Sequence, residues 1–193
     1  MTRGPDDRKD EENMNFVGID IGSTASKVSV RGDKEINYVL PTGWSSKETA
    51  GIIKEKLLEE GVDVEAEDTK VVATGYGRIA VDYADYVITE ITCHARGAHH
   101  LDPAVRTVID IGGQDSKVIR LSESGAVETF AMNDKCAAGT GRFLEMMART
   151  LQMKLPEMSE LGLDWHNDVT ISSMCTVFAE SEVVSLIARS TAP

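Results

Sequence analysis

The chain has 193 residues, 41% of them hydrophobic, and a formal net charge of −12. This length allows one large domain or two small ones with a sizeable core. The acidic balance argues against nucleic-acid partners or anionic membrane surfaces, and no apolar run is long enough to span a bilayer. Three cysteines and a charged N-terminus without a secretory pattern predict a cytoplasmic protein in a reducing compartment.

Three short strands are predicted after an N-terminal tail, residues 1–14, that we expect to be disordered. They are Asn15–Ile21, Ser26–Val30 and Glu35–Leu40. A helix is then expected to begin after Ser45, which stands at capping-box spacing from Glu48, and to end at Gly61. Farther along, the pattern predicts a strand at Lys70–Thr74 and a helix at Thr89–Leu101.

The second half of the chain repeats this opening. Three strands are predicted, followed by two helices: Arg106–Ile111, Ser116–Leu121, Ala126–Met132, Ala137–Leu151 and Thr176–Ser190. An order of strands then helices, occurring twice, indicates an α/β protein with two lobes, residues 15–104 and 105–193.

Two nine-residue stretches, Asp20–Val28 and Asp110–Val118, are identical at six positions. Each follows an apolar run, so each is predicted to be a strand that enters a tight glycine turn. Such a turn lets backbone N–H groups approach phosphate oxygens, and a carboxylate at the strand end can hold a hydrated Mg²⁺ ion. One copy alone is more often a plain turn, but two copies at domain spacing favour a nucleotide-binding clamp.

Two of the three cysteines, Cys136 and Cys175, each stand just before a predicted helix. A helix N-terminus favours the thiolate, which is the form that binds metal. Two thiolates are too few for an iron–sulfur cluster, but a symmetric dimer would supply four. A four-cysteine zinc site between subunits would use the same ligands. Cys93, inside a helix, is interpreted as a small buried side chain. His94, His99 and His100 on the same helix are interpreted as a solvated face.

From about residue 15 to residue 191 the sequence resembles a known family. The motifs that carry the resemblance are Gly18–Lys27, Ala73–Arg78, Val108–Lys117, Asn133–Arg142 and Ser172–Glu182. They resemble the BadF/BadG/BcrA/BcrD-type ATPases, which include activators of 2-hydroxyacyl-CoA dehydratases and ATPase subunits of benzoyl-CoA reductase. The resemblance implies duplicated ribonuclease H-like lobes of the actin/hexokinase/Hsp70 ATPase type. The family's glycine-rich adenosine loop and returning helix are not found, so we expect a C-terminally truncated member.

The family's activity would be ATP-dependent electron transfer. The resemblance implies a homodimer that shares one [4Fe–4S] cluster, held by Cys136 and Cys175 of each subunit. Hydrolysis of ATP to ADP with Mg²⁺ would drive one low-potential electron, supplied by ferredoxin or flavodoxin, to a 2-hydroxyacyl-CoA dehydratase.

Individual roles follow from the matched motifs. We expect Asp20 and Asp110 to hold Mg²⁺ through water, and Glu90 or Gln114 to orient the attacking water. The nucleotide would contact residues of both glycine loops and of the Asn133–Arg142 motif: Gly22, Ser23, Thr24, Lys27, Gly112, Gly113, Gln114, Asp115, Gly139 and Gly141. Lys27 and Lys117 could equally be solvated strand residues, and Glu90 a simple helix-start charge.

Three alternatives remain open at the level of sequence. The chain could be an ATPase subunit of a benzoyl-CoA reductase, because that enzyme uses the same ATPase module. It could be a cluster-free actin-like or sugar-kinase-type phosphotransferase, for which the glycine loops alone would suffice. It could also be a non-enzymatic dimer bridged by structural zinc.

Overall fold

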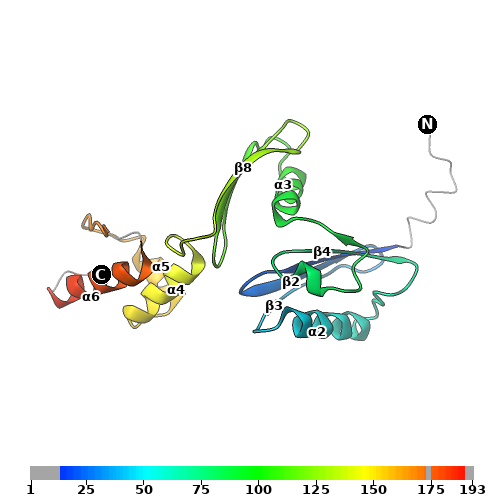
Figure 1. Cartoon of the computed structure of the whole chain (residues 1–193), viewed down its shortest axis with the longest axis horizontal. Helices are drawn as coiled ribbons and strands as arrows, with labels where there is room; N and C mark the ends of the chain where they lie inside the picture. Colours follow the sequence, from blue (N-terminus) through cyan, green and yellow to red (C-terminus); the bar gives the residue numbers. More distant parts are fainter. Residues whose placement is uncertain (1–13, 173–174, 190–193) are drawn as a thin grey trace. The chain divides into compact units, whose positions relative to one another are not determined.

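The computed structural model describes residues 14–172 and 175–189, so the tail predicted over residues 1–14 lies outside the described residues except for its last position. The chain divides into two units, one ending at Pro103 and the other beginning at Ala104. Figure 1 shows the elements in chain order.

A five-stranded sheet forms the first unit. Its strands are β1 (Asn15–Ile21), β2 (Ala25–Arg31), β3 (Ile36–Pro41), β4 (Thr69–Thr74) and β5 (Tyr86–Val87), in the order β3-β2-β1-β4-β5. The pairs β1–β2 and β2–β3 are antiparallel, whereas β4 runs parallel to both β1 and β5. The carboxyl ends of β1 and β4 therefore lie side by side.

The core of this unit lies on one face of the sheet, beneath helix α2 (Ser46–Glu59). Successive strand residues point to opposite faces, so Val17 and Ile19 are buried in this core while Asp20 belongs to the other face. Ile53 of α2 is buried against the strands. The predicted start of α2 is confirmed, because the Ser45 side chain accepts a hydrogen bond from the Glu48 N–H at 3.2 Å.

The rest of the first unit consists of a short 3-10 helix, η1 (Arg78–Ala80), and helix α3 (Glu90–Leu101). Thr89 caps α3 and its side chain accepts a hydrogen bond from the Thr92 N–H at 3.4 Å. The helix predicted at Thr89–Leu101 is thus confirmed.

The second unit begins with the same antiparallel arrangement. Strands β6 (Thr107–Ile111), β7 (Ser116–Leu121) and β8 (Val127–Asn133) form a sheet in the order β6-β7-β8. Asp110 stands opposite Lys117, as Asp20 stands opposite Lys27 in the first unit. The predicted repeat of a three-strand opening is confirmed, and the structure adds that the strand register is repeated as well.

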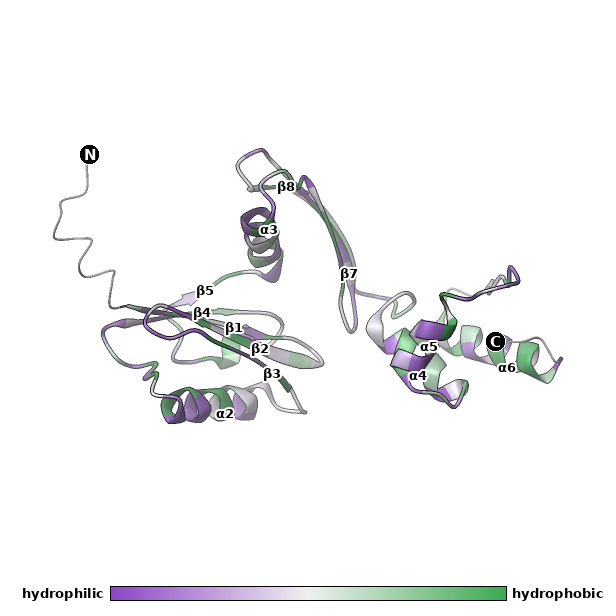
Figure 2. Ribbon diagram, turned by 180° about the vertical axis from the view of Figure 1, so that it is seen from behind, coloured by the Kyte–Doolittle hydropathy of each residue, from purple (hydrophilic) through white to green (hydrophobic). Residues whose placement is uncertain are grey.

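Three helices follow: α4 (Gly141–Thr150), α5 (Leu155–Leu161) and α6 (Thr176–Ala188). Helix α4 packs against both α5 and α6. Much of α6 is apolar, as the green ribbon in Figure 2 shows. Helix α5 was not predicted; Pro156 stands in its first turn, where proline favours a helix start. The end predicted for α6, Ser190, lies outside the described residues.

The predicted start of α4 at Ala137 is wrong. The helix begins at Gly141, because Gly139 has a positive φ of 76° and Thr140 is extended. The Thr140 N–H instead donates to the Ala137 carbonyl and closes a turn. Cys136 therefore precedes this turn rather than the helix.

Within the described part of the chain, no helix has both the length and the hydropathy that crossing a bilayer requires.

Replacing Ile53 by alanine tests the core beneath α2. Ile53 is fully buried, so we expect the change to cost about 2–5 kcal/mol in the free energy of unfolding. Its neighbour Ile52 is 48% exposed, and Ile52→Ala should cost less than about 1 kcal/mol. Urea unfolding measures both, and equal losses would contradict this placement of the core.

Candidate functional site

The first glycine loop connects β1 to β2 and holds Asp20 opposite Lys27. Lys27 Nζ lies 3.0 Å from Asp20 Oδ2, and the Gly22 N–H donates to the Ala25 carbonyl at 3.2 Å, which closes the turn. The Lys27 side chain is 53% exposed. The ion pair therefore orients the Asp20 carboxylate at the surface of the sheet and contributes little to stability.

A buried threonine supports this loop from below. The Thr42 hydroxyl donates to the Gly22 carbonyl at 2.8 Å and accepts from the Ser26 hydroxyl at the same distance. Because the Gly22 carbonyl is held in this way, the turn keeps a fixed shape, as binding of a phosphate by backbone N–H groups requires. Thr42 could not be found from local sequence patterns, because this contact joins residues 20 positions apart.

The second oxygen of Asp20 is positioned by the loop that follows β4. Asp20 Oδ1 is buried and has no hydrogen-bond partner among the described residues. Gly75, with a positive φ of 84°, lies directly over it, and a Cβ there would approach Oδ1 to 2.3 Å. A buried carboxylate oxygen without a donor fits a site for a hydrated cation, so these residues suit Mg²⁺.

The second glycine loop has the same register and a different charge arrangement. Lys117 Nζ lies 3.1 Å from Asp110 Oδ2 and 3.0 Å from Asp115 Oδ2. The Lys117 side chain is 2% exposed, so its interpretation as a solvated residue is wrong. Asp115 stands where the first loop has Ala25, and this extra carboxylate lets a lysine be buried there.

This second loop is bonded to the first turn of α4. The Gly141 N–H donates to the Gly112 carbonyl at 2.9 Å, and the Arg142 N–H donates to the Gly113 carbonyl at 3.0 Å. Three of the glycines predicted to bind nucleotide, Gly112, Gly113 and Gly141, are thus brought together. Gly139 is exposed in the preceding turn.

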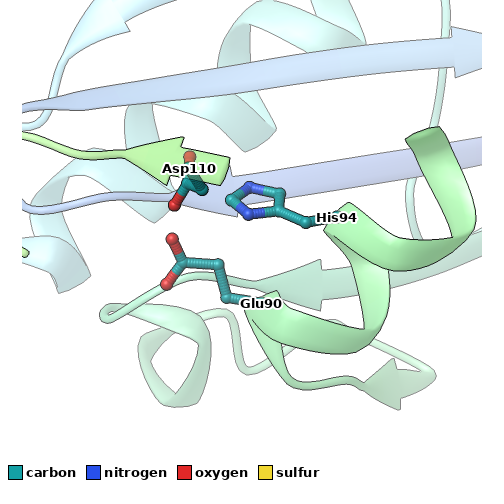
Figure 3. Close-up of side chains that lie close together, drawn as sticks. All are labelled: Glu90, His94 and Asp110. Carbon is teal, nitrogen blue, oxygen red and sulfur yellow. The ribbon is translucent and has the colours of Figure 1, made fainter. Parts of the chain in front are cut away.

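The remaining predicted site residues lie in the turns or on α3. Ser23 is half-buried, whereas Thr24 and Gln114 are exposed at the tips of the two loops. Glu90 is the first residue of α3, and His94 lies one turn later on the same side (Figure 3). A Glu90 oxygen and a His94 ring nitrogen lie within 4.8 Å of each other. His94 is half-buried, so its assignment to a solvated face is wrong; the i,i+4 spacing from Glu90 could have indicated this pair.

A pocket of about 470 Å³ opens on the face of the first sheet opposite α2. It is lined by Gly18, Ile19, Asp20, Lys27, Val28, Ser29, Asn37, Tyr38, Val39, Val72, Thr74 and Cys93. Burial, and secondarily the charge of Glu60, raises the pKa of Tyr38 to about 12. The Tyr38 ring packs against the core beneath α2, with Lys56 Nζ of that helix 4.1 Å from the ring centroid, so its side chain lies on the α2 side of the sheet.

The two predicted metal ligands lie in segments that lead into two packed helices. Cys175 caps α6, and Cys136 precedes the turn that leads into α4. The Thr150 hydroxyl of α4 donates to a Glu180 oxygen of α6 at 3.0 Å. The residues that directly follow the two cysteines line one pocket of about 260 Å³ together with four residues of α4: Ala137, Thr176, Arg142, Glu145, Met146 and Arg149. The residue after each cysteine therefore lies at the same pocket.

Comparison with known proteins agrees with this geometry, since residues 17–192 match one family throughout. The chain belongs to the BadF/BadG/BcrA/BcrD ATPase family. The 2-hydroxyisocaproyl-CoA dehydratase activator of Clostridioides difficile is 47% identical over 89% of this chain and 65% of its own length. A benzoyl-CoA reductase subunit of Thauera aromatica is 37% identical over 90% of this chain and 64% of its own length. The chain thus spans about two thirds of these relatives.

A solved structure shows the same architecture. The activator of the 2-hydroxyisocaproyl-CoA dehydratase from Clostridium difficile with bound ADPNP superposes with a TM-score of 0.80 at 42% identity. The match covers 92% of this chain and 67% of that one. The predicted fold class, an α/β protein with duplicated lobes of the actin/hexokinase/Hsp70 ATPase type, is confirmed.

Methionine substitutions compare the two lysines. Lys117→Met leaves two neighbouring carboxylates without their shared cation, and we expect a loss of about 3–5 kcal/mol in unfolding free energy. Lys27→Met removes a half-exposed pair and should cost no more than about 1 kcal/mol. Urea unfolding measures both variants. Similar losses at the two positions would contradict the asymmetry between the loops.

Proposed function

We propose that this chain is an ATP-dependent one-electron donor that activates a 2-hydroxyacyl-CoA dehydratase. Its electron would come from a reduced ferredoxin or flavodoxin and leave to the dehydratase. The observation that carries the proposal is the pair of backbone hydrogen bonds between the second glycine loop and the first turn of α4, next to the Cys136 segment. These bonds would link a loop that binds nucleotide to the chain segment that follows a candidate cluster ligand.

The nucleotide part of the proposal rests on the duplicated loops. Asp20 and Asp110 would hold a hydrated Mg²⁺ ion, and the turn N–H groups would bind phosphates. The buried, unpartnered oxygen of Asp20 is the feature that fits such an ion. Glu90 and Gln114 stay candidates for orienting the water that attacks the terminal phosphate.

Coupling between nucleotide and electron transfer would use the contacts of Gly112 and Gly113. If the second loop takes different conformations with ATP and with ADP, the hydrogen bonds to the carbonyls of these glycines would shift the first turn of α4. The two nucleotides must favour different arrangements of the loop, because equal affinity would shift no equilibrium. Helix α4 packs on α6, so the segments of both cysteines would respond together.

The donor set fits a cluster shared between two chains. Cys136 and Cys175 are both reduced thiols, and four thiolates are the usual ligand set of a [4Fe–4S] cluster. When bound, the cluster would accept and release one electron at a time. Two guanidinium groups, of Arg142 and Arg149, and one carboxylate, of Glu145, line the adjoining pocket, and the net formal charge of +1 would favour an anionic site there.

A homodimer is supported by the surface beside Cys175. Val177 and Phe178, which follow it on α6, are more than 60% exposed despite being apolar. Exposed apolar side chains beside a half-complete ligand set suit contact with a second copy of the chain.

The alternatives differ in what they require of the cysteines. A subunit of a benzoyl-CoA reductase would use the same glycine loops and cysteines. This alternative is favoured less, because the sequence identity to the benzoyl-CoA reductase subunit is lower than that to the dehydratase activator. A cluster-free phosphotransferase gives no reason for the two cysteine segments to share a pocket. A zinc-bridged dimer would keep the ligands without ATP-coupled electron transfer.

Serine substitutions of the three cysteines test the cluster. The wild-type chain, purified without oxygen, should contain about four irons per dimer with matching sulfide. Cys136→Ser and Cys175→Ser should lose the iron, whereas Cys93→Ser, which lies on α3, should keep it. Metal and sulfide analysis with native mass spectrometry reads all three. Zinc in place of iron would favour the zinc-bridged dimer, and a metal-free monomer would contradict the activator.

Alanine at position 20 tests the proposed metal role. Asp20→Ala should lower Mg²⁺-dependent ATP hydrolysis by about 100-fold, because the ion loses a carboxylate that orients its water shell. The melting temperature should change little, since the lost pair with Lys27 is half-exposed. Asp33→Ala, an exposed acid in the next turn, is the matched control. Undiminished turnover in the Asp20 variant would exclude this role.

A further inference from the structure

The segment Ala73–Arg78 contains a threonine that stands beside the Asp20 carboxylate. In the parallel pairing of β1 with β4, Thr74 is the direct partner of Asp20, and both residues are near the carboxyl ends of their strands. Neighbours paired in this way have side chains on the same face of a sheet. Ligands of open α/β sheets bind at that end of the strands, so Thr74 occupies a position suited to a ligand.

Thr74 and Asp20 share an unusual property. Thr74 Oγ1 and Asp20 Oδ1 are both buried, and neither has a hydrogen-bond partner among the described residues. Buried polar atoms in folded proteins are nearly always satisfied, so two such atoms on paired residues indicate a common ligand. Both residues also line the pocket on the open face of the sheet, together with Lys27.

The loop after β4 fixes Thr74 in this position. The Gly77 N–H donates to the Ile21 carbonyl at 2.8 Å, and the Arg78 guanidinium donates to the Gly75 carbonyl at 2.9 Å. Gly75 approaches Asp20 so closely that no Cβ fits between them. The hydroxyl and the carboxylate are therefore held on a rigid part of the first unit, as a preorganised site requires.

The chemistry of the two oxygens favours a hydrated divalent cation. Mg²⁺ keeps several of its waters and takes few protein ligands, and these are oxygens. A threonine hydroxyl can accept a hydrogen bond from a metal-bound water while the neighbouring carboxylate accepts another. Ser29 lies on the same face and lines the same pocket, but its hydroxyl already donates to Asn37 Oδ1 at 2.9 Å.

We propose that Thr74 is a metal-positioning residue, whose hydroxyl shares with Asp20 the water shell of the Mg²⁺ ion that accompanies the nucleotide. The proposal rests on the ATP-binding role proposed above and adds a residue to it. Thr74 acts through water and does not touch the reacting phosphate.

The test measures metal affinity directly. Mn²⁺ replaces Mg²⁺ in the presence of ADP, and electron paramagnetic resonance reports the free Mn²⁺. Thr74→Val keeps the shape of the side chain but removes the hydroxyl, and should raise the dissociation constant for Mn²⁺ by about 10- to 100-fold. Thr74→Ser restores the hydroxyl and should recover most of the affinity. Ser29→Ala, which removes an already paired hydroxyl from the same pocket, should leave it unchanged.

The possible outcomes separate this inference from the proposed function. Equal Mn²⁺ affinity for Thr74→Val and the wild-type chain overturns the role of Thr74 and leaves the ATPase proposal standing. If Thr74→Val lowers the affinity for ADP in metal-free buffer, the Thr74 hydroxyl contacts the phosphates instead of the metal's water shell, and this result also overturns the proposed role of Thr74. No binding of Mn²⁺ with ADP to the wild-type chain overturns the nucleotide site itself, and the role of Thr74 with it.

Discussion

The arrangement of this site depends on an ion pair across a tight turn between two strands. In both copies, an aspartate one residue before the end of the first strand stands directly opposite a lysine of the next strand. The turn that joins them closes through a glycine N–H, with Gly22 in one copy and Gly112 in the other. Because the strand pairing fixes the register, it also fixes the orientation of each aspartate carboxylate and the position of the loop residues around it.

The two copies of the loop differ in which groups hold their backbone carbonyls. The Gly22 carbonyl accepts from the Thr42 hydroxyl, a side chain buried within the first unit. The Gly112 carbonyl accepts from the backbone of α4. On the proposed function, the first loop is a fixed reference for the metal, whereas the second can transmit a change in the nucleotide to the cysteine segment. On this proposal, the shared sequence motif would serve a different role in each copy.

The sequence predicted the strands and the paired loops well, because both follow from local patterns. Alternation of apolar residues placed β1 at its observed bounds, and Ser45 marked the start of α2. The predicted start of α4 was wrong because helix propensity does not reveal the turn that Gly139 makes. Contacts between residues distant in sequence were also missed: the burial of Lys117 depends on Asp115 packing back across the turn, and the place of Thr74 depends on how β4 pairs with β1.

Charge explains why an acidic protein can offer a site for an anionic nucleotide. In the first loop, Asp20 and Lys27 have formal charges that cancel, so the turn N–H groups can attract phosphate without opposition. In the second loop, Lys117 faces both Asp110 and Asp115, which leaves a formal excess of one negative charge among these three side chains. On the proposed function, phosphates that approach this loop would meet this negative charge, and the divalent cation that accompanies the nucleotide would compensate it. The residue difference that creates this excess charge is Asp115, which stands where the first copy has Ala25.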